Sequence, residues 1–216
     1  MPATRHPAAR GGAIVPPATV RFLPDRSALE TDLVPPAPAA DRLRRELDRA
    51  EQRFVARVAG AGGIAAWRAD MAGAFAAARP APPASRARSA GLVVALLDGV
   101  VRDRCWLAVE QGDPVDLPGW TDLWRHLARH ALRPYRAEPL FLLAWTLWRS
   151  GDRMTAGLVT AMVGREDPTH RAGGMLAEVV RLRLDPARVP PLCGRRPTVR
   201  PTVPVPPARP TRIGRR

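Results

Sequence analysis

The sequence predicts an all-α protein: a small helical bundle of about six to eight helices between two tails. Three observations support this prediction. Apolar residues recur at three- and four-residue spacing over most of the chain, as they do on one face of a helix. No segment shows the apolar–polar alternation that is typical of a half-buried strand. Hydrophobic residues make up 46% of the 216 residues, which is enough to form a core.

Composition divides the chain into three parts. Residues 1–21 are rich in proline, glycine and alanine, and we predict that they are disordered. Residues 22–186 carry the helical pattern and form the predicted all-α domain. Residues 187–216 form a proline- and arginine-rich tail, which we also predict to be disordered.

The first half of the domain contains a short helical turn at residues 26–33 and then three longer helical regions. The region over residues 40–60 places Leu43, Leu47 and Phe54 on one stripe with charged residues between them. The region over residues 63–78 is rich in alanine and includes Trp67 and Phe75. The region over residues 85–111 is predicted as one long helical segment.

The second half begins with an amphipathic helix over residues 120–132. The stretch that follows, PLFLLAWTLW, leaves almost no polar face, which predicts a buried helix. We predict that Gly151 ends this helix in a left-handed conformation and that Asp152 caps the next one, which runs to about Gly164. By the same reasoning, Asp167 is predicted to cap the last helix, with Pro168 in its first turn.

The spacing of small residues in this hairpin is similar to that of a tetratricopeptide repeat, a helix–turn–helix unit of about 34 residues. Ala144 and Ala156 stand where two helices must approach closely, Gly151 stands at the turn, and Pro168 closes the unit. Two interpretations remain open: a hairpin that serves only the core, and a repeat that presents a binding surface. The residues of this structural signature are Ala144, Trp145, Trp148, Gly151, Asp152, Ala156, Asp167 and Pro168.

The pattern LLAW, WR-x-GD and DP, in this order, resembles the C-terminal region of the actinobacterial family called domain of unknown function 4192. Here these motifs are at residues 142–145, 148–152 and 167–168. VRD at residues 101–103 and LPDRSAL at residues 23–29 are also similar, so the resemblance spans about residues 22–186. It implies the fold and the lineage but no activity. Full members look as if they carry a further N-terminal α/β half, so one hypothesis is that this chain is a fragment without it.

The net charge of +14 comes entirely from arginine, because the sequence contains no lysine. The last 28 residues hold seven arginines and no acid, and such a segment can bind nucleic-acid phosphates non-specifically through counterion release. The alternative is that this tail reflects only a GC-rich genome. The candidate anion-binding residues are Arg195, Arg196, Arg200, Arg209, Arg212, Arg215 and Arg216.

No catalytic signature is visible, and we predict that the protein is not an enzyme and has no cofactor. Asp122, His126 and His130 follow one another at four-residue spacing and could share a metal, but they are also typical of a solvated helix face, and we predict no metal site. Cys105 and Cys193 are too few for a disulfide framework. With no signal peptide and no membrane span in sight, we predict a cytoplasmic protein without a membrane partner.

Two functions follow as hypotheses. The leading one is a helical module for protein–protein contact, which uses the outer face of the hairpin at Arg153, Thr160 or Arg165. The alternative is a nucleic-acid-associated accessory protein that uses the arginine-rich tail.

Overall fold

A computed structural model describes residues 25–35 and 39–190, and within these ranges the chain is helical without a strand. This confirms the predicted all-α class. The predictions for residues 1–21 and for the seven tail arginines lie outside the described residues, as does Cys193. The α-helices are α1 (Arg26–Leu33), α2 (Ala40–Ala59), α3 (Gly63–Ala78), α4 (Arg86–Ala95), α5 (Gly99–Gln111), α6 (Leu117–Arg129), α7 (Ala137–Arg149), α8 (Arg153–Glu166) and α9 (Arg171–Arg181).

The described part of the chain holds nine α-helices instead of six to eight, because the long region predicted over residues 85–111 is two helices. The chain turns after Leu96, and the side chain of Asp98 accepts a hydrogen bond from the backbone N–H of Val101 at 3.0 Å. An aspartate in this position caps a new helix start, so α5 begins at Gly99. The apolar residues continue without interruption up to Leu97, so the sequence pattern gave no sign of this turn.

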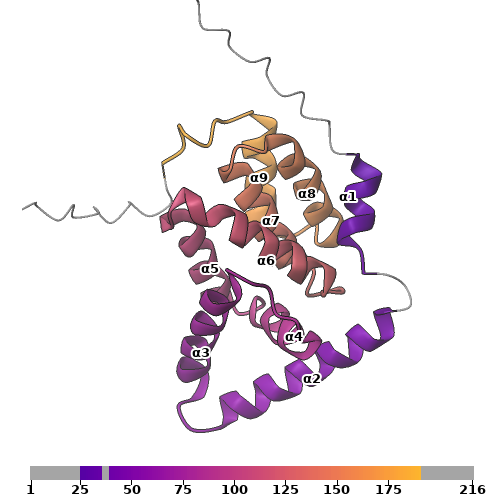
Figure 1. Cartoon of the computed structure of the whole chain (residues 1–216), viewed down its shortest axis with the longest axis vertical. Coiled ribbons are helices and arrows are strands. Elements are labelled where there is room, and N and C mark those ends of the chain that lie inside the picture. The colour runs from indigo at the N-terminus through magenta and orange to yellow at the C-terminus, as the bar shows by residue number, and fades with distance from the viewer. Residues whose placement is uncertain (1–24, 36–38, 191–216) are drawn as a thin grey trace, which may run out of the picture.

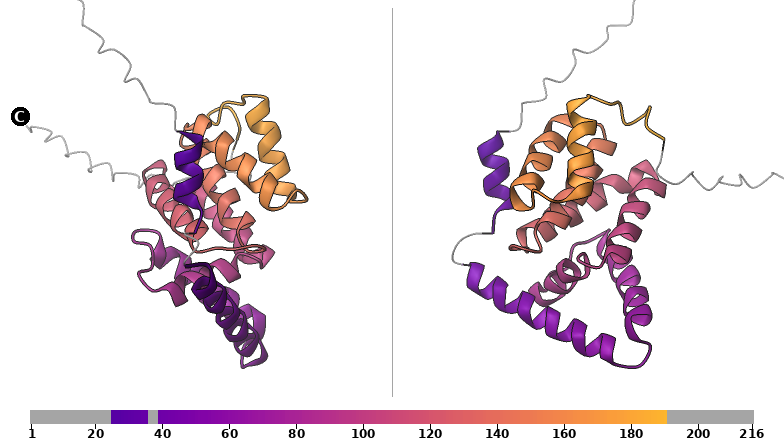
Figure 2. Two further views of the ribbon diagram at one scale, coloured as in Figure 1. Left: turned by 90° about the vertical axis from the view of Figure 1, so that its right-hand side faces the viewer. Right: turned by 180° about the vertical axis from the view of Figure 1, so that it is seen from behind.

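The helices form two groups that share one core (Figure 1). α2 to α5 lie at one end of the molecule, with α2 as a long helix along its edge, and α6 to α9 lie at the other end. Figure 2 shows the same division from the side and from behind. α7 packs against α6, α8, α9 and α5, and α2 packs mainly against α4 and α3.

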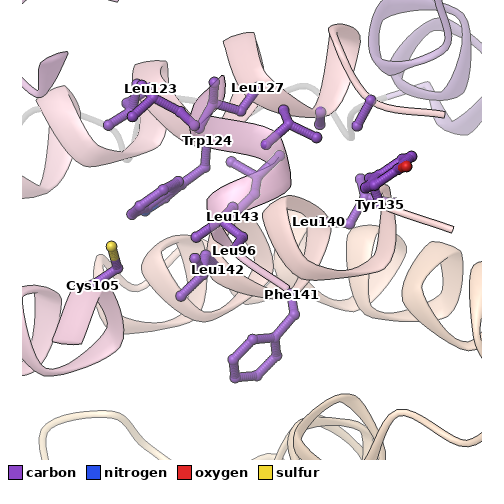
Figure 3. Packing of buried hydrophobic residues seen from close by; sticks show 14 of the residues in the cluster. Leu96, Cys105, Leu123, Trp124, Leu127, Tyr135, Leu140, Phe141, Leu142 and Leu143 are labelled. Carbon is purple, nitrogen blue, oxygen red and sulfur yellow. The ribbon is translucent and has the colours of Figure 1, made fainter. Parts of the chain in front are cut away.

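The centre of the core is α7. Every residue from Pro139 to Trp148 is buried, as its apolar sequence predicts. Figure 3 shows Leu142 and Leu143 on the side of α7 that faces Trp124 of α6, whereas Phe141 points away from α6. The polar side chain inside this stretch, Thr146, donates a hydrogen bond to the carbonyl of Leu142 at 2.8 Å, so its burial leaves no donor unpaired.

Charged contacts fix α1 to the rest of the bundle. Arg129 pairs with Asp32, and Arg165 pairs with Glu30 at 2.5 Å. The guanidinium of Arg136 donates to the carbonyl of Leu33, whose side chain is fully buried. The short helical turn expected from the sequence is therefore a helix docked against α6 and α8. Across residues 25–35 and 39–190, the structure contains no helix with the length and apolar character needed to cross a bilayer.

Candidate functional site: an arginine-lined cavity between α3, α5 and α6

The turn between α7 and α8 has the geometry that the sequence predicts. Gly151 adopts a φ of 87°, in the left-handed region. Its N–H donates to the carbonyl of Trp148, and the N–H of Asp152 donates to the carbonyl of Leu147, both at 3.0 Å. The side chain of Asp152 then accepts from the N–H of Thr155 and caps α8. The hairpin is thus closed by backbone bonds at its turn.

The two small residues of the hairpin, Ala144 and Ala156, are fully buried. Trp145 and Trp148 are each 1% exposed, so neither indole can form a binding surface. Thr160 is also buried, and its hydroxyl donates to the carbonyl of Ala156. The alanines and tryptophans of the hairpin signature are therefore packing residues.

A polar cluster brings Trp145 and Arg149 of α7 together with Glu110 of α5. The carboxylate of Glu110, which is fully buried on α5, accepts from Trp145 Nε1 and from Arg149 Nε, both at 2.6 Å. The guanidinium of Arg149 also lies over the rings of both tryptophans. Its remaining N–H groups donate to the carbonyls of Pro186 and Val189. This cluster joins α5, α7 and the segment after α9, so we assign it a structural role.

The prediction for the start of the last helix is wrong. α9 begins at Arg171, and its cap is His170, whose Nδ1 accepts from the N–H of Gly173 at 2.9 Å. Asp167 instead accepts from the N–H and the hydroxyl of Thr169, and these hydrogen bonds lower the pKa of its carboxyl. Asp167 and Pro168 thus form a turn before the helix, because the cap position falls three residues later.

The two histidines that the sequence singles out lie at the C-terminal end of α6, where His130 follows the last helical residue, Arg129. His126 and His130 stack with their rings 4.2 Å apart, and His126 Nε2 lies 2.8 Å from the hydroxyl of Ser89 on α4. Burial, together with the charge of His130, lowers the pKa of His126 to about 4. Asp122 lies near Arg125 instead, and no group of three or more metal-ligating side chains occurs in the part of the chain that the structure describes.

A cavity of about 300 Å³ opens between α3, α5 and α6. Its floor is apolar and buried, formed by Phe75, Val101, Cys105 and Trp120. Its rim consists of small or charged residues: Ala72, Ala76, Ala108, Arg68, Arg79 and Arg104. Small ligand pockets in proteins start at about this size and combine an apolar lining with a few polar groups.

The cavity exists because α3 is rich in alanine. Ala72 and Ala76 lie one turn apart on the side of α3 that faces the cavity, where larger side chains would close it. Ala108 plays the same part on α5. The sequence reasoning missed this site, since it interpreted the segment only as an apolar helix. The signal was the run of alanines between Arg68 and Arg79.

The three arginines at the rim differ in their partners. Arg68 forms a bidentate ion pair with Asp98, which raises the pKa of the guanidinium. Arg79 pairs with Asp116 at 2.5 Å and lies 5.9 Å from the ring centroid of Trp120. Arg104 has no ion pair within residues 25–35 and 39–190. It therefore offers a positive charge at the mouth without a carboxylate to balance it.

Two of the residues that line the cavity, Cys105 and Trp120, carry buried polar groups. The indole Nε1 of Trp120 is buried and has no acceptor among the described residues. Burial raises the pKa of the Cys105 thiol to about 12, so the thiol stays protonated at neutral pH. The lining thus contains a protonated thiol rather than a thiolate nucleophile, and the indole N–H of Trp120 is covered by neighbouring atoms.

The two arginines that flank Asp103 on α5 have different surroundings. Arg102 pairs with Asp103 and, at 3.2 Å, with Glu138 of α7, whereas Arg104 lines the cavity. Glu138 also lies 3.1 Å from Nε2 of His170, although the two atoms are not aligned for a hydrogen bond. The contacts of Arg102 and Glu138 join α5, α7 and the start of α9.

The fold and the site together define an all-α domain with a cavity of ligand size. A family model described as Domain of unknown function (DUF4192) matches residues 9–187, and this chain belongs to that family. The match begins upstream of Phe22, where the sequence resemblance was expected to start. Neither a curated protein nor a solved structure matches the chain.

Proposed function

We propose that this protein is a non-enzymatic binding module that recognises a partner protein through the cavity between α3, α5 and α6. The observation that carries the proposal is the combination of an apolar floor with Arg104, an unpaired arginine at the rim. The proposal keeps the protein–protein function that the sequence favours but moves it away from the hairpin, where Trp145 and Trp148 are internal. The cytoplasm remains the proposed location, supported by the free thiol of Cys105.

The chemistry of the cavity favours an acidic segment of the partner with one large apolar side chain. A volume of about 300 Å³ can hold a single phenylalanine or leucine side chain, and such buried anchors dominate the energy of many interfaces. Arg104, whose charge no carboxylate of the described residues balances, would attract a carboxylate beside the anchor. The protonated thiol of Cys105 on the floor supports binding rather than catalysis.

Fluorescence anisotropy with a labelled peptide GEEFEEG and the full chain tests the proposal. The peptides GEEAEEG and GKKFKKG test the contributions of the anchor and of the acids. We expect Ala72→Trp, which fills the cavity, to abolish binding of GEEFEEG, and Arg104→Gln to weaken it about tenfold, or ~1.4 kcal/mol. Arg171→Gln is the matched control, because this exposed arginine on α9 is also unpaired within the described residues.

Thermal unfolding of each variant shows whether the fold is kept, since both substitutions lie at the rim of the cavity. The proposal fails if Ala72→Trp binds the peptide as tightly as the unmodified chain does. It also fails if GEEAEEG binds as tightly as GEEFEEG, because the cavity would then contribute nothing.

A further inference from the structure

A second region, on the outer edge of α2, carries arginines that have no role in the cavity or the core. Arg42, Arg45, Arg49 and Arg53 follow one another at spacings of three, four and four residues and so lie along one side of the helix. All four are exposed. With a rise of about 1.5 Å per residue, the row is about 17 Å long. We call these four residues the arginine row.

The row continues onto the start of α4. The guanidinium of Arg53 donates to the carbonyl of Ala87 at 3.3 Å, and Arg86 and Arg88 flank this residue in the chain. Both flanking arginines are exposed, and the first turn of α4 contains no acid. The positive end of the α4 dipole therefore adds to the charge of these arginines rather than offsetting it.

The pairing of these arginines sets them apart from most others in the molecule. Arg49 has a carboxylate partner, Glu46, at 2.9 Å. Within the described ranges, no carboxylate lies at ion-pairing distance from the others, which are Arg42, Arg45, Arg53, Arg86 and Arg88. Elsewhere, arginines such as Arg68, Arg129 and Arg149 are paired with acids of neighbouring helices.

Of the acids of α2, Glu46 lies beside the row and pairs with Arg49, whereas Asp48 and Glu51 lie near Tyr135. Asp48 and Glu51 act on Tyr135, in the connection between α6 and α7, and together with burial they raise the pKa of its hydroxyl. The apolar stripe of α2, with Leu43, Leu47 and Ala50, is buried in the core. Four arginines, with the carboxylate of Glu46 beside Arg49, thus lie along the exposed side of α2.

We propose that the arginine row, with Arg86 and Arg88, binds the phosphate backbone of nucleic acid. These guanidinium groups are exposed, and among the described residues only that of Arg49 has a carboxylate partner. Such a line of positive charge matches a line of phosphates, and each contact releases a condensed counterion. A lipid surface fits less well, because an interfacial helix must insert its apolar face, and that of α2 is buried against α4. The site differs from the arginine-rich tail and from the cavity.

The test compares two sets of four substitutions in the full chain, each of which removes four positive charges. One variant is R42Q/R45Q/R53Q/R88Q, in α2 and α4, and the other is R195Q/R196Q/R200Q/R209Q, in the tail. Binding to a labelled 20-base-pair DNA duplex of arbitrary sequence is measured from 50 to 200 mM NaCl. The charge-keeping variant R42K/R45K/R53K/R88K and circular dichroism show whether lost binding reflects lost charge or lost fold.

We expect the helix variant to lower the slope of log K against log salt by up to ~3.6, since each phosphate contact contributes ~0.9. Affinity at 50 mM NaCl should fall at least tenfold, and the lysine variant should restore most of it. Wild-type affinity and slope in the helix variant would overturn the proposal. So would the absence of duplex binding by the unmodified chain, or binding to vesicles with 30% phosphatidylserine in place of DNA.

Discussion

The helices α3 and α7 are both rich in apolar residues, but α7 is almost completely buried whereas most residues of α3 are at least partly exposed. α7 is buried on all sides from Pro139 to Trp148. α3 buries Trp67, Phe75 and Ala78 and exposes Ala72 and Ala76 beside a cavity. Their difference is the size of the side chains. α7 carries leucine, phenylalanine and tryptophan, whereas α3 carries mainly alanine.

This comparison shows that side-chain volume, more than apolar character, determines where the bundle closes. Large side chains on α7 fill the space between four neighbouring helices. Alanines on α3 reach too short a distance to fill the gap toward α5, and the gap remains open. The structural centre and the proposed binding site thus arise from two sequences of similar hydrophobicity.

The largest expected difference in stability is between two variants that each lose a carboxylate. Glu110 pairs with Arg149 of α7, and Asp70 lies on α3. Glu110→Ala leaves the guanidinium of Arg149 buried and takes the acceptor from Trp145, so we expect a loss of about 3–5 kcal/mol in unfolding free energy. Asp70 forms an exposed ion pair with Arg57 of α2. Asp70→Ala should therefore lower the unfolding free energy by only about 0–1 kcal/mol. Urea unfolding followed by circular dichroism measures both. Equal losses would break the comparison.

An intermediate effect is expected from the same substitution in both helices. Ala144→Leu adds volume where the core is closed and should destabilise the protein by about 1–3 kcal/mol. Ala76→Leu adds the same volume at the open rim of the cavity and should change stability by less than about 0.5 kcal/mol. Thermal and urea unfolding of the two variants decide this point. A large loss of stability with Ala76→Leu would show that the space beside Ala76 is not open, contrary to the cavity described above.

The smallest expected effect concerns a glycine at the end of α7 and one inside α3. Gly151 has a φ of 87°, so Gly151→Ala forces a left-handed alanine and should cost about 1 kcal/mol. Gly73 lies within α3 with open space around its Cβ position, so Gly73→Ala should stabilise the helix by about 0.5–1 kcal/mol. The two changes in urea midpoint should have opposite signs. A shared sign would mean that one of the two backbone assignments is wrong.

Local sequence rules predicted much of the second half of the fold. The buried helix, the left-handed Gly151 and the cap at Asp152 were all correct, because each depends on residues within a few positions. The predicted cap at Asp167 was wrong, although it too depended on nearby residues. Both Asp167 and His170 can accept a hydrogen bond at a helix start, and α9 uses His170. The turn before α5 was missed because Leu96 and Leu97 continue the apolar pattern.

Contacts between distant segments could not be predicted in this way. The bond from Arg149 to Glu110 joins residues 39 positions apart, and the pair between Glu30 and Arg165 joins residues 135 positions apart. No periodic pattern marks such partners. The same holds for the cavity, whose walls come from three helices that meet only in the folded chain.

By itself, the sequence determined the all-α class, most helix positions and the deep burial of α7, because hydrophobic periodicity and caps act over a few residues. It also determined the excess of arginine. Only the tertiary structure decided which arginines are neutralised by acids, such as Arg68 and Arg149, and which have no acidic partner among the described residues, such as Arg104 and Arg53. Ion pairs and cavities depend on how helices distant in sequence pack together, and their geometry exists only once the bundle has formed.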